Sequence, residues 1–391
     1  MRPRVVMVCP WNYLRAHAGF QYLADALHFR GFHIKVYARI PRNMLVELAE
    51  RPYAVMSRES AWYARIPLVR RVLFRREIIR AWTDDADAML CYDLGFFREA
   101  VEIKRQQPSK LLVLVSPDIF APEDCPGNPF VEFYEKHANV PDVTVDVEPH
   151  RAEWRKTRFG LRHDVLVIPN TLPSNEAPPA AAPGTLRSLA GADIPGWKHV
   201  IVFAGGLYPG VPLERLVRAC AMLKERVFLL AFCHGPPQRI AALRQLSSEL
   251  LGPQSGRISG PVPRRALLSC LWEASAGLVF YPPSAQRTVN QLYCAPAKFF
   301  EYLAAGIPVV TTANESLRPI VTSRDVGAVA RDDSAEAFAE AIDALLSRSD
   351  LPEIRRRARK LFLDELCYEK AAEPALSRLC GMIEEATSAR R

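Results

Sequence analysis

The sequence predicts an α/β protein built from two doubly wound parallel sheets, and three observations support this fold class. Short β-rich runs alternate with helix-like segments along both halves of the chain. A stretch rich in proline, alanine and glycine, at residues 171–198, separates the two halves. A chain of 391 residues is also longer than one ordinary hydrophobic core supports. Strands that alternate with helices favour a parallel sheet covered on both faces.

The first half, residues 1–170, is expected to form one domain. Its strand patterns are RVVMVCP, HIKVYAR, ADAMLCYD, KLLVLVSPD, VTVDVE and DVLVIPN. Between the first two of them, GFQYLADALHFRGF places apolar residues at helical spacing, and Gly31 is a stop signal for that helix.

Residues 171–198 are predicted to be a linker, because they have little aliphatic periodicity. The alternating pattern then restarts over residues 199–351, the predicted second domain. Its strand patterns are HVIVFAG, VFLLAFC, RISGPV, AGLVFYP, PVVTT and VGAVAR. A helical tail is expected over residues 352–391.

One helix of the second half, in PAKFFEYLAAGIPVVTT (296–312), carries two charges among apolar residues. Pro296 suits the first helical position and Gly306 suits the C-terminal cap. The small residues on either side of Glu301 leave room for a ligand, and a carboxylate can accept two hydroxyls. The alternative is that Glu301 and Lys298 form an ordinary surface pair.

Composition places the chain among globular proteins, with 49% hydrophobic and 24% charged residues. No apolar run approaches the roughly 20 residues of a membrane span, and no signal-peptide pattern opens the sequence, so a cytoplasmic location is expected. The nine scattered cysteines and eight dispersed histidines indicate neither disulfides nor a metal site.

Basic charge is concentrated between Arg51 and Trp82, where eight arginines accompany two glutamates. From Pro67 this stretch is predicted to be an amphipathic helix. Its basic part, Arg65–Arg80, either contacts an anionic membrane surface peripherally or is an ordinary solvated helix face. Nucleic acid is not an expected partner, because no binding motif accompanies the charge.

The segment KFFEYLAAGIPVVTT resembles the donor-site motif K-x-x-E-Y-x-A-x-G-x-P-V-V of GT-B glycosyltransferases of group 1 (family 4-like). The matching residues are Lys298, Glu301, Tyr302, Ala304, Gly306, Pro308, Val309 and Val310. FGLRHDVLVIPNTLP, VIVFAGGLYPGVPLERLVRA and the tail ARKLFLDELCYEKAAEPAL are similar to further segments of that family, in the same order. The resemblance implies a GT-B architecture, with two Rossmann-like domains facing across a cleft and the tail crossing back to the first domain.

The resemblance also implies the activity and the site. It implies a metal-independent transferase that takes its sugar from a nucleotide-sugar donor and uses no other cofactor. Donor contacts are expected at Glu301 (ribose), Lys298 and Arg287 (diphosphate), Gly205 and Gly206 (backbone N–H groups), and Val262 (nucleobase edge). On the acceptor side, Gly19 is expected in the loop that faces the sugar, with Asp118 and His17 as candidate catalytic residues.

Several points stay open at the level of sequence. Cys294 stands where many retaining enzymes of this kind carry a first glutamate, and Asn290, Gln291 or Arg287 could replace its sugar contact. Asp118 is the preferred base for an inverting reaction, ahead of Glu148 and His150, whereas a retaining reaction, which is slightly favoured, needs no side-chain base. The expected acceptor is a lipid-linked saccharide or polysaccharide precursor at the inner membrane surface. The alternatives are a soluble small molecule, a nucleotide-sugar epimerase, or a non-catalytic subunit that partners another enzyme.

Overall fold

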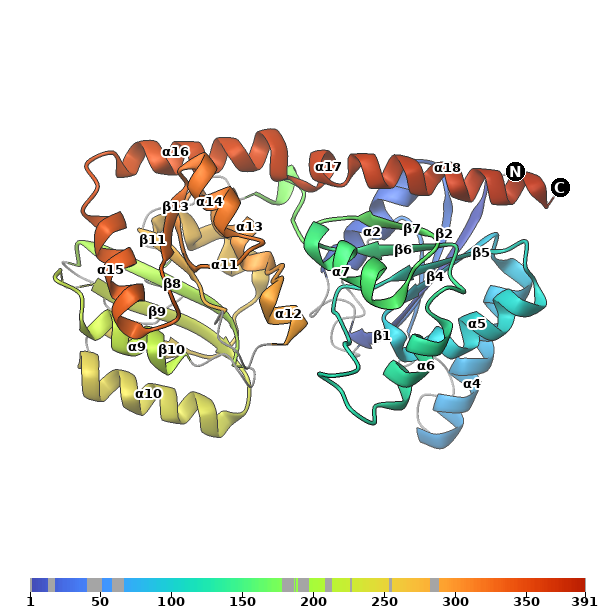
Figure 1. The fold of residues 1–391 in the computed structure, drawn as a ribbon, viewed down its shortest axis with the longest axis horizontal. Helices are drawn as coiled ribbons and strands as arrows, with labels where there is room; N and C mark the ends of the chain where they lie inside the picture. The colour runs from blue at the N-terminus through green and yellow to red at the C-terminus, as the bar shows by residue number, and fades with distance from the viewer. Residues whose placement is uncertain are drawn as a thin grey trace. The chain divides into compact units, whose positions relative to one another are not determined.

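The computed structural model describes residues 2–12, 18–40, 51–57, 67–177, 186, 188, 197–207, 213–225, 227–252, 255–281 and 288–390. The chain divides into two compact units. The first unit comprises Met1–Asn170 together with Ala371–Arg391, and the second comprises Thr171–Lys370. Each unit contains one parallel sheet with helices beside it, as the ribbon of Figure 1 shows. The predicted α/β fold class is therefore confirmed.

The first unit is built on a seven-stranded sheet of order β3-β2-β1-β4-β5-β6-β7. Its elements are β1 (Arg4–Asn12), α2 (Ala18–Phe29), β2 (His33–Arg39), β3 (Ala54–Ser57), α4 (Pro67–Arg80), η3 (Ala81–Asp85), β4 (Ala88–Tyr92), η4 (Leu94–Phe96), α5 (Phe97–Gln106), β5 (Leu111–Val115), α6 (Pro129–His137), β6 (Val143–Asp146), α7 (Pro149–Phe159), β7 (Asp164–Val167) and α18 (Glu373–Ala389). The sequence patterns predicted six of the seven strands and missed only the short edge strand β3.

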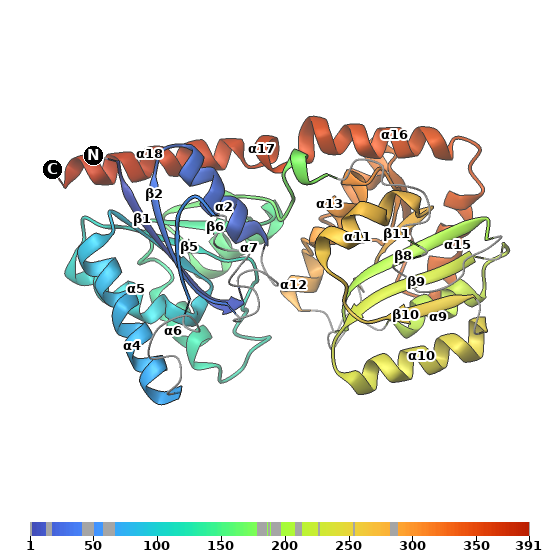
Figure 2. The same cartoon turned by 180° about the vertical axis from the view of Figure 1, so that it is seen from behind.

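The second unit is built on a six-stranded sheet of order β10-β9-β8-β11-β12-β13, which Figure 2 shows from behind. Its elements are η5 (Ser174–Glu176), β8 (His199–Gly206), α9 (Glu214–Ala221), β9 (Val227–His234), α10 (Pro237–Leu251), β10 (Gly256–Ser259), α11 (Arg264–Cys270), η6 (Leu271–Glu273), β11 (Ala276–Val279), α12 (Val289–Leu292), α13 (Ala297–Ala304), β12 (Val309–Thr312), α14 (Arg318–Arg324), β13 (Gly327–Ala330), α15 (Ala335–Leu346), α16 (Leu351–Leu361), η7 (Phe362–Leu366) and α17 (Tyr368–Ala371). All six strands coincide with predicted patterns.

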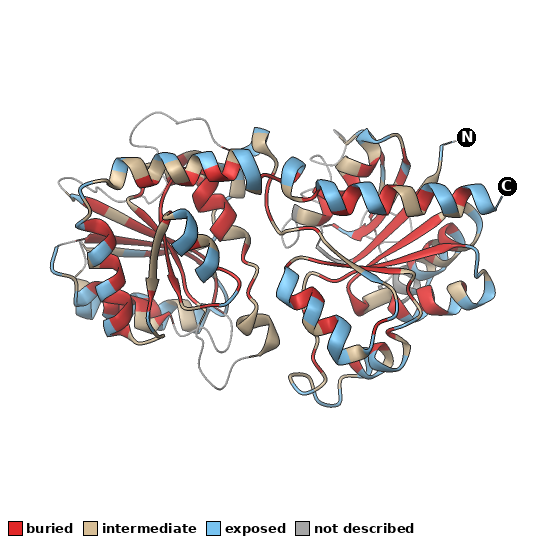
Figure 3. Ribbon diagram, turned by 45° about the horizontal axis from the view of Figure 1, so that its top comes forward, coloured by how far each residue is buried: buried red, intermediate tan, exposed pale blue. Residues whose placement is uncertain are grey.

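Central strands in both sheets are buried on both faces, which explains their continuous aliphatic sequences. Every residue of β4, β5, β11 and β12 is buried, and Figure 3 shows this burial beside helices that are exposed along one side. All nine cysteines are free, and eight of them are buried, so they act as small apolar side chains.

Helix α13 ends beside Gly306, as its sequence indicates, but it begins at Ala297, one residue after the predicted Pro296. Pro296 is the residue before the first helical turn rather than part of it, and its extended backbone directs the chain into the helix. Gly306 has a φ of +67°, a conformation that favours glycine, and its N–H donates to the Leu303 carbonyl. Phe299 and Leu303 are fully buried, so this face of the helix packs into the core.

The ring of Tyr302 anchors α13 against the sheet. Its hydroxyl accepts a hydrogen bond from the Ala204 N–H at 3.0 Å, near the end of β8. A side chain on Gly277 of β11 would collide with this ring, so glycine leaves the space that the tyrosine fills. The backbone of α13 is therefore fixed relative to both central strands.

The C-terminal residues are shared between the two units. Helix α16 lies in the second unit, where Arg359 donates to the Ala304 carbonyl at the end of α13. Helix α18 lies in the first unit, where Glu373 pairs with Arg30 and Arg390 pairs with Asp87. The sequence pattern did not locate this division within residues 352–391.

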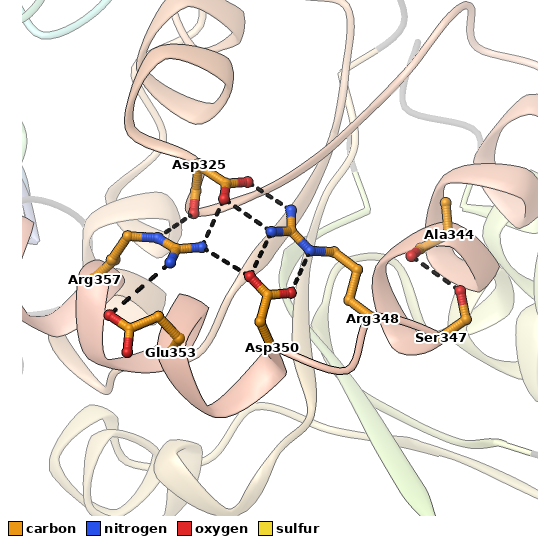
Figure 4. A network of polar contacts seen from close by, with 7 residues as sticks. All are labelled: Asp325, Ala344, Ser347, Arg348, Asp350, Glu353 and Arg357. Carbon is orange, nitrogen blue, oxygen red and sulfur yellow. Dashed lines mark hydrogen bonds and ion pairs between the residues drawn. The ribbon is translucent and has the colours of Figure 1, made fainter.

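An ion-pair network ties α14, α15 and α16 together in the second unit (Figure 4). Arg348 binds Asp325 at 2.6 Å and Asp350 at 2.7 Å, and Arg357 binds Asp325 at 2.6 Å. Hydrogen bonds from Arg348 are the main cause that lowers the pKa of Asp350 to about 2. These side chains are partly exposed, so solvent screens each pair and its contribution to stability is small.

Helix α4 confirms the helix predicted from Pro67. Its buried residues Phe74 and Ile78 join the core of the first unit, while Arg76 and Arg80 are exposed on the other side. Arg75 pairs with Glu99 at 2.7 Å, so part of the basic charge is neutralised. Among the described residues, no helix has the length and apolarity that crossing a membrane requires.

Candidate functional site

The candidate donor site lies at the carboxyl ends of the strands of the second sheet. In the sheet, β8 pairs with β9 on one side and with β11 on the other. The chain thus builds the sheet outward from β8 through β9 and β10, and then returns to the opposite side of β8 with β11. The order of the strands therefore reverses between β8 and β11. Open parallel sheets bind their ligands at such a reversal, beyond the carboxyl ends of the strands.

Lys298 places its ammonium group at this reversal. Its Nζ lies 4.1 Å from the centre of the Phe203 ring near the end of β8, and 5.6 Å from that of Tyr281, just after β11. It makes no ion pair with a carboxylate anywhere in the described part of the chain. Burial lowers the pKa of Lys298 to about 8. A cation in this position lacks an anionic partner, which a phosphate group would supply.

The predicted glycines lie next to this lysine. Gly205 and Gly206 are the last residues of β8, and they pair in register with Cys233 and His234 of β9. A Cβ on Gly205 would collide with the end of the Lys298 side chain and lie 3.3 Å from the Phe203 ring. Glycine at 205 therefore leaves the space that the Lys298 side chain occupies.

Glu301 is buried one turn farther along α13, with 8% of its surface exposed. Its Oε1 accepts a hydrogen bond from Arg264 Nε at 2.8 Å. Its other oxygen, Oε2, receives no hydrogen bond from any residue that the structure describes. Glu301 and Lys298 thus do not form the surface pair that was the alternative prediction. One carboxylate oxygen remains able to accept a hydroxyl.

Val262 lies in the turn between β10 and α11. Its backbone N–H and carbonyl make no hydrogen bond within the described residues. These two groups form a donor–acceptor pair that can contact the edge of a nucleobase. This geometry is compatible with the predicted role of Val262.

In the first unit, Asp118 follows β5 at the carboxyl edge of the sheet. Its carboxylate has no hydrogen-bond or ion-pair partner among the described side chains, whereas its backbone is firmly held. Arg155 donates to the Asp118 carbonyl at 3.3 Å, and Arg151 donates to the Pro117 carbonyl at 2.6 Å. Two arginines of α7 therefore fix a loop whose carboxylate stays available to a ligand.

The lower-ranked base candidates are engaged in structural contacts. Glu148 Oε2 accepts from the Arg151 N–H at 2.8 Å and so caps α7, and its Oε1 contacts His150 Nδ1 at 2.7 Å. Gly19 is the second residue of α2, and a Cβ there would lie 3.6 Å from the Asn170 side chain. Of the three predicted base candidates, Asp118 is therefore the one whose side chain has no hydrogen-bond or ion-pair contact among the described residues.

Two predicted site residues, His17 and Arg287, lie outside the described residues. Cys294 is buried near Lys298. Its interaction with the ammonium raises the pKa of Lys298, against the larger lowering that burial causes. Gln291 uses its side-chain oxygen to accept from the Thr288 N–H at 3.1 Å, which caps α12. The side chain of Gln291 is therefore already engaged in this cap.

Sequence reasoning missed two notable residues. Arg264, the partner of Glu301, carried no signal beyond its place two residues after Val262. Asp93 ends β4 with a φ of +66°, an uncommon conformation for a residue other than glycine, and its carboxylate accepts from the Leu94 N–H at 2.7 Å. Neither position stands out in a single sequence.

Comparison with known families gives a match within the second unit. Residues 198–348 match the family described as Glycosyl transferases group 1. This range contains β8 to β13 and every described donor-site residue discussed above. A comparison with curated protein sequences finds no match.

Solved structures share the fold over the whole chain. A glycosyltransferase from Rickettsia africae is 14% identical with a TM-score of 0.72, over 99% of both chains. HepE from Anabaena, solved in complex with UDP-glucose, is 13% identical with a TM-score of 0.74, over 99% of both chains. Sucrose-phosphate synthase from Thermosynechococcus elongatus is 15% identical with a TM-score of 0.67, over 100% of both chains. These similarities, with the family match, confirm the predicted GT-B fold.

Proposed function

We propose that this protein is a glycosyltransferase that takes a sugar from a nucleoside-diphosphate donor without a metal ion. The observation that carries the proposal is the position of Lys298. Its ammonium lies at the reversal of strand order, without an ion pair to any described carboxylate, on the same helix as Glu301. A diphosphate supplies the missing negative charge, and the family match over residues 198–348 supports the same reading.

The proposed donor pose uses three neighbouring parts of the site. The diphosphate lies against Lys298, beside Gly205 and Gly206 at the end of β8, where positive charge stabilises the departing nucleoside diphosphate. The ribose donates a hydroxyl to Oε2 of Glu301. The nucleobase edge pairs with the backbone of Val262.

Replacing Glu301 should remove nucleotide binding. At a concentration about 100 times the dissociation constant, UDP, GDP or dTDP should stabilise the protein by about 2.7 kcal/mol, which appears as a rise in melting temperature. Glu301→Ala should lose most of this rise, because the ribose loses its acceptor. Glu340→Ala removes an exposed glutamate of α15 and serves as the control. Absence of any nucleotide-induced rise in the unaltered protein would contradict the donor site.

The acceptor that we propose is a lipid-linked saccharide or polysaccharide precursor at a membrane surface, which the protein contacts peripherally through α4. The exposed Arg76 and Arg80 on this helix, and Val72 with 52% of its surface exposed, support contact with anionic headgroups.

Removing two arginines of α4 should weaken binding to anionic vesicles. Each basic residue near the surface contributes about 1 kcal/mol, so Arg76→Ser with Arg80→Ser should lower vesicle affinity about 30-fold. Sedimentation with vesicles that contain phosphatidylserine measures this change, and neutral vesicles test the role of charge. The control is Arg331→Ser with Arg356→Ser, two exposed arginines of the second unit. Equal affinity of both variants would exclude α4 as the contact surface.

We further propose a retaining reaction, in which the leaving phosphate accepts the acceptor proton and Asp118 binds the acceptor. Asp118→Asn should then raise KM for the acceptor while lowering kcat less than about tenfold. An inverting enzyme would instead lose a general base, and kcat would fall about 10²- to 10⁴-fold. NMR of the product anomer, alongside a screen of nucleotide-sugar donors with lipid extract as acceptor, decides between these outcomes.

A further inference from the structure

We propose that Arg264 and Glu176 are positioning residues of the nucleotide site and couple it to the segment Thr171–Ala177, called here the connecting segment. This inference rests on the proposed donor role of Glu301. Neither residue need touch the nucleotide, since each acts through its neighbour.

The geometry is a chain of three charged side chains from three elements. Arg264, the first residue of α11, donates from Nε to Oε1 of Glu301 at 2.8 Å. It also donates from Nη1 to Oε2 of Glu176 at 2.8 Å. The guanidinium is thus held at two edges by two carboxylates, one on α13 and one on η5.

This arrangement determines what Glu301 presents to a ligand. Its side chain is 11% exposed, whereas those of Arg264 and Glu176 are 37% and 41% exposed. A carboxylate so deeply buried needs a fixed hydrogen-bonding partner to remain oriented. Because Arg264 occupies Oε1, the carboxylate presents Oε2 to the ribose. Glu176 holds the other edge of the planar guanidinium and so supports this orientation.

The connecting segment is itself joined to the C-terminal part of the second unit. Thr171 Oγ1 donates to the Leu366 carbonyl at 2.7 Å, and the Tyr368 N–H donates to the Leu172 carbonyl at 3.0 Å. The boundaries of the two units fall at residues 170/171 and 370/371. Both places where the chain passes from one unit to the other therefore adjoin this hydrogen-bonded cluster.

Thermodynamic linkage makes the coupling reciprocal. If Glu176 strengthens nucleotide binding through Arg264, then the nucleotide must stabilise the Glu176–Arg264 contact by the same factor. The connecting segment offers amide probes of this effect, because the Glu176 N–H donates to Pro173 at 3.1 Å and the Ala177 N–H donates to Ser174 at 3.2 Å.

The first test measures affinities for UDP, GDP and dTDP by titration calorimetry. Glu176→Gln should weaken binding about three- to tenfold, and Arg264→Met should weaken it more. Adding Glu176→Gln to Arg264→Met should have no further effect, because the glutamate acts only through the arginine. Glu340→Gln removes another exposed Glu–Arg pair of the same unit and should change affinity less than about twofold.

The second test needs no nucleotide. Amide hydrogen exchange at Ser174, Glu176 and Ala177 should become several-fold faster in Glu301→Gln than in Glu340→Gln, since Arg264 loses its ionic contact with Glu301. If nucleotides bind but Glu176→Gln behaves like Glu340→Gln, the positioning role is overturned and the donor site stands. If none of the three nucleotides binds the unaltered protein, the proposed function fails. The exchange result then decides alone whether Glu301 is coupled to the connecting segment.

Discussion

Lys298→Met should lower kcat/KM for sugar transfer about 10²- to 10³-fold, the loss seen when a site loses one preorganised group that stabilises developing charge. The departing diphosphate gains negative charge in the transition state, and Lys298 Nζ is held between two aromatic rings where such a group would lie. Steady-state kinetics with the donor found by screening measures the effect. Lys198→Met, which removes an exposed lysine of the same unit, should leave kcat/KM unchanged.

The lowered pKa of Lys298 also predicts how nucleotide affinity and stability depend on pH. It is lowered by burial from its ordinary value of 10.5 to about 8, so the nucleotide-free site loses its charge as the pH rises through about 8. Nucleotide affinity should therefore fall over this range. The unfolded chain keeps the proton up to about pH 10.5, so this residue makes the protein more stable as the pH rises from about 8 to 10.5. Nucleotide affinity that is constant from pH 7 to 9.5 would argue against Lys298 as the phosphate ligand.

Arg155→Met should destabilise the first unit by about 3–5 kcal/mol, because it leaves the Asp146 carboxylate buried without a cation. The two side chains are 1% and 0% exposed, and they are joined at 2.9 Å. Arg155 also donates to the Tyr134 hydroxyl at 3.3 Å and to the Asp118 carbonyl. The same change should therefore loosen the loop that presents Asp118.

Urea unfolding, followed by a signal from the first unit, measures this loss. Arg158→Met on the same helix is the matched control, since its partners Glu123 and Glu135 are exposed and the pair contributes about 1 kcal/mol or less. Combining Arg155→Met with Asp146→Leu should restore part of the stability, because no unpaired charge remains. A loss no larger than that of Arg158→Met would show that the buried pair is not a principal support of the fold.

The sheets could be predicted from sequence because buried parallel strands have a strong aliphatic signal. The pattern KLLVLVSPD, for example, contains the fully buried β5. By contrast, β3 has only four residues at a sheet edge, two of them exposed, so its sequence AVMS lacks that signal. The resemblance implied that the tail crosses back to the first domain, but the sequence did not place the crossing at residues 370/371, because its position depends on packing partners distant in sequence.

Helix α13 shows which parts of the candidate site can be predicted and which cannot. Lys298 and Glu301 were predicted as donor contacts because they interrupt an apolar helix at a recognisable spacing. Arg264 lies 37 residues before Glu301 in the sequence, and only the pairing of β9 with β10 and of β8 with β11 brings their elements together. Single-sequence reasoning has no access to such a contact.

The passage of the chain out of the first unit and back into it also has a consequence for biosynthesis. Residues 171–370 form one uninterrupted segment, whereas the first unit needs Ala371–Arg391 to complete it. The ribosome therefore synthesises the whole second unit before α18 can pack onto the first unit. We expect the nascent N-terminal unit to stay incomplete until α18 has been synthesised, so that truncations that remove α18 impair the half of the protein synthesised first.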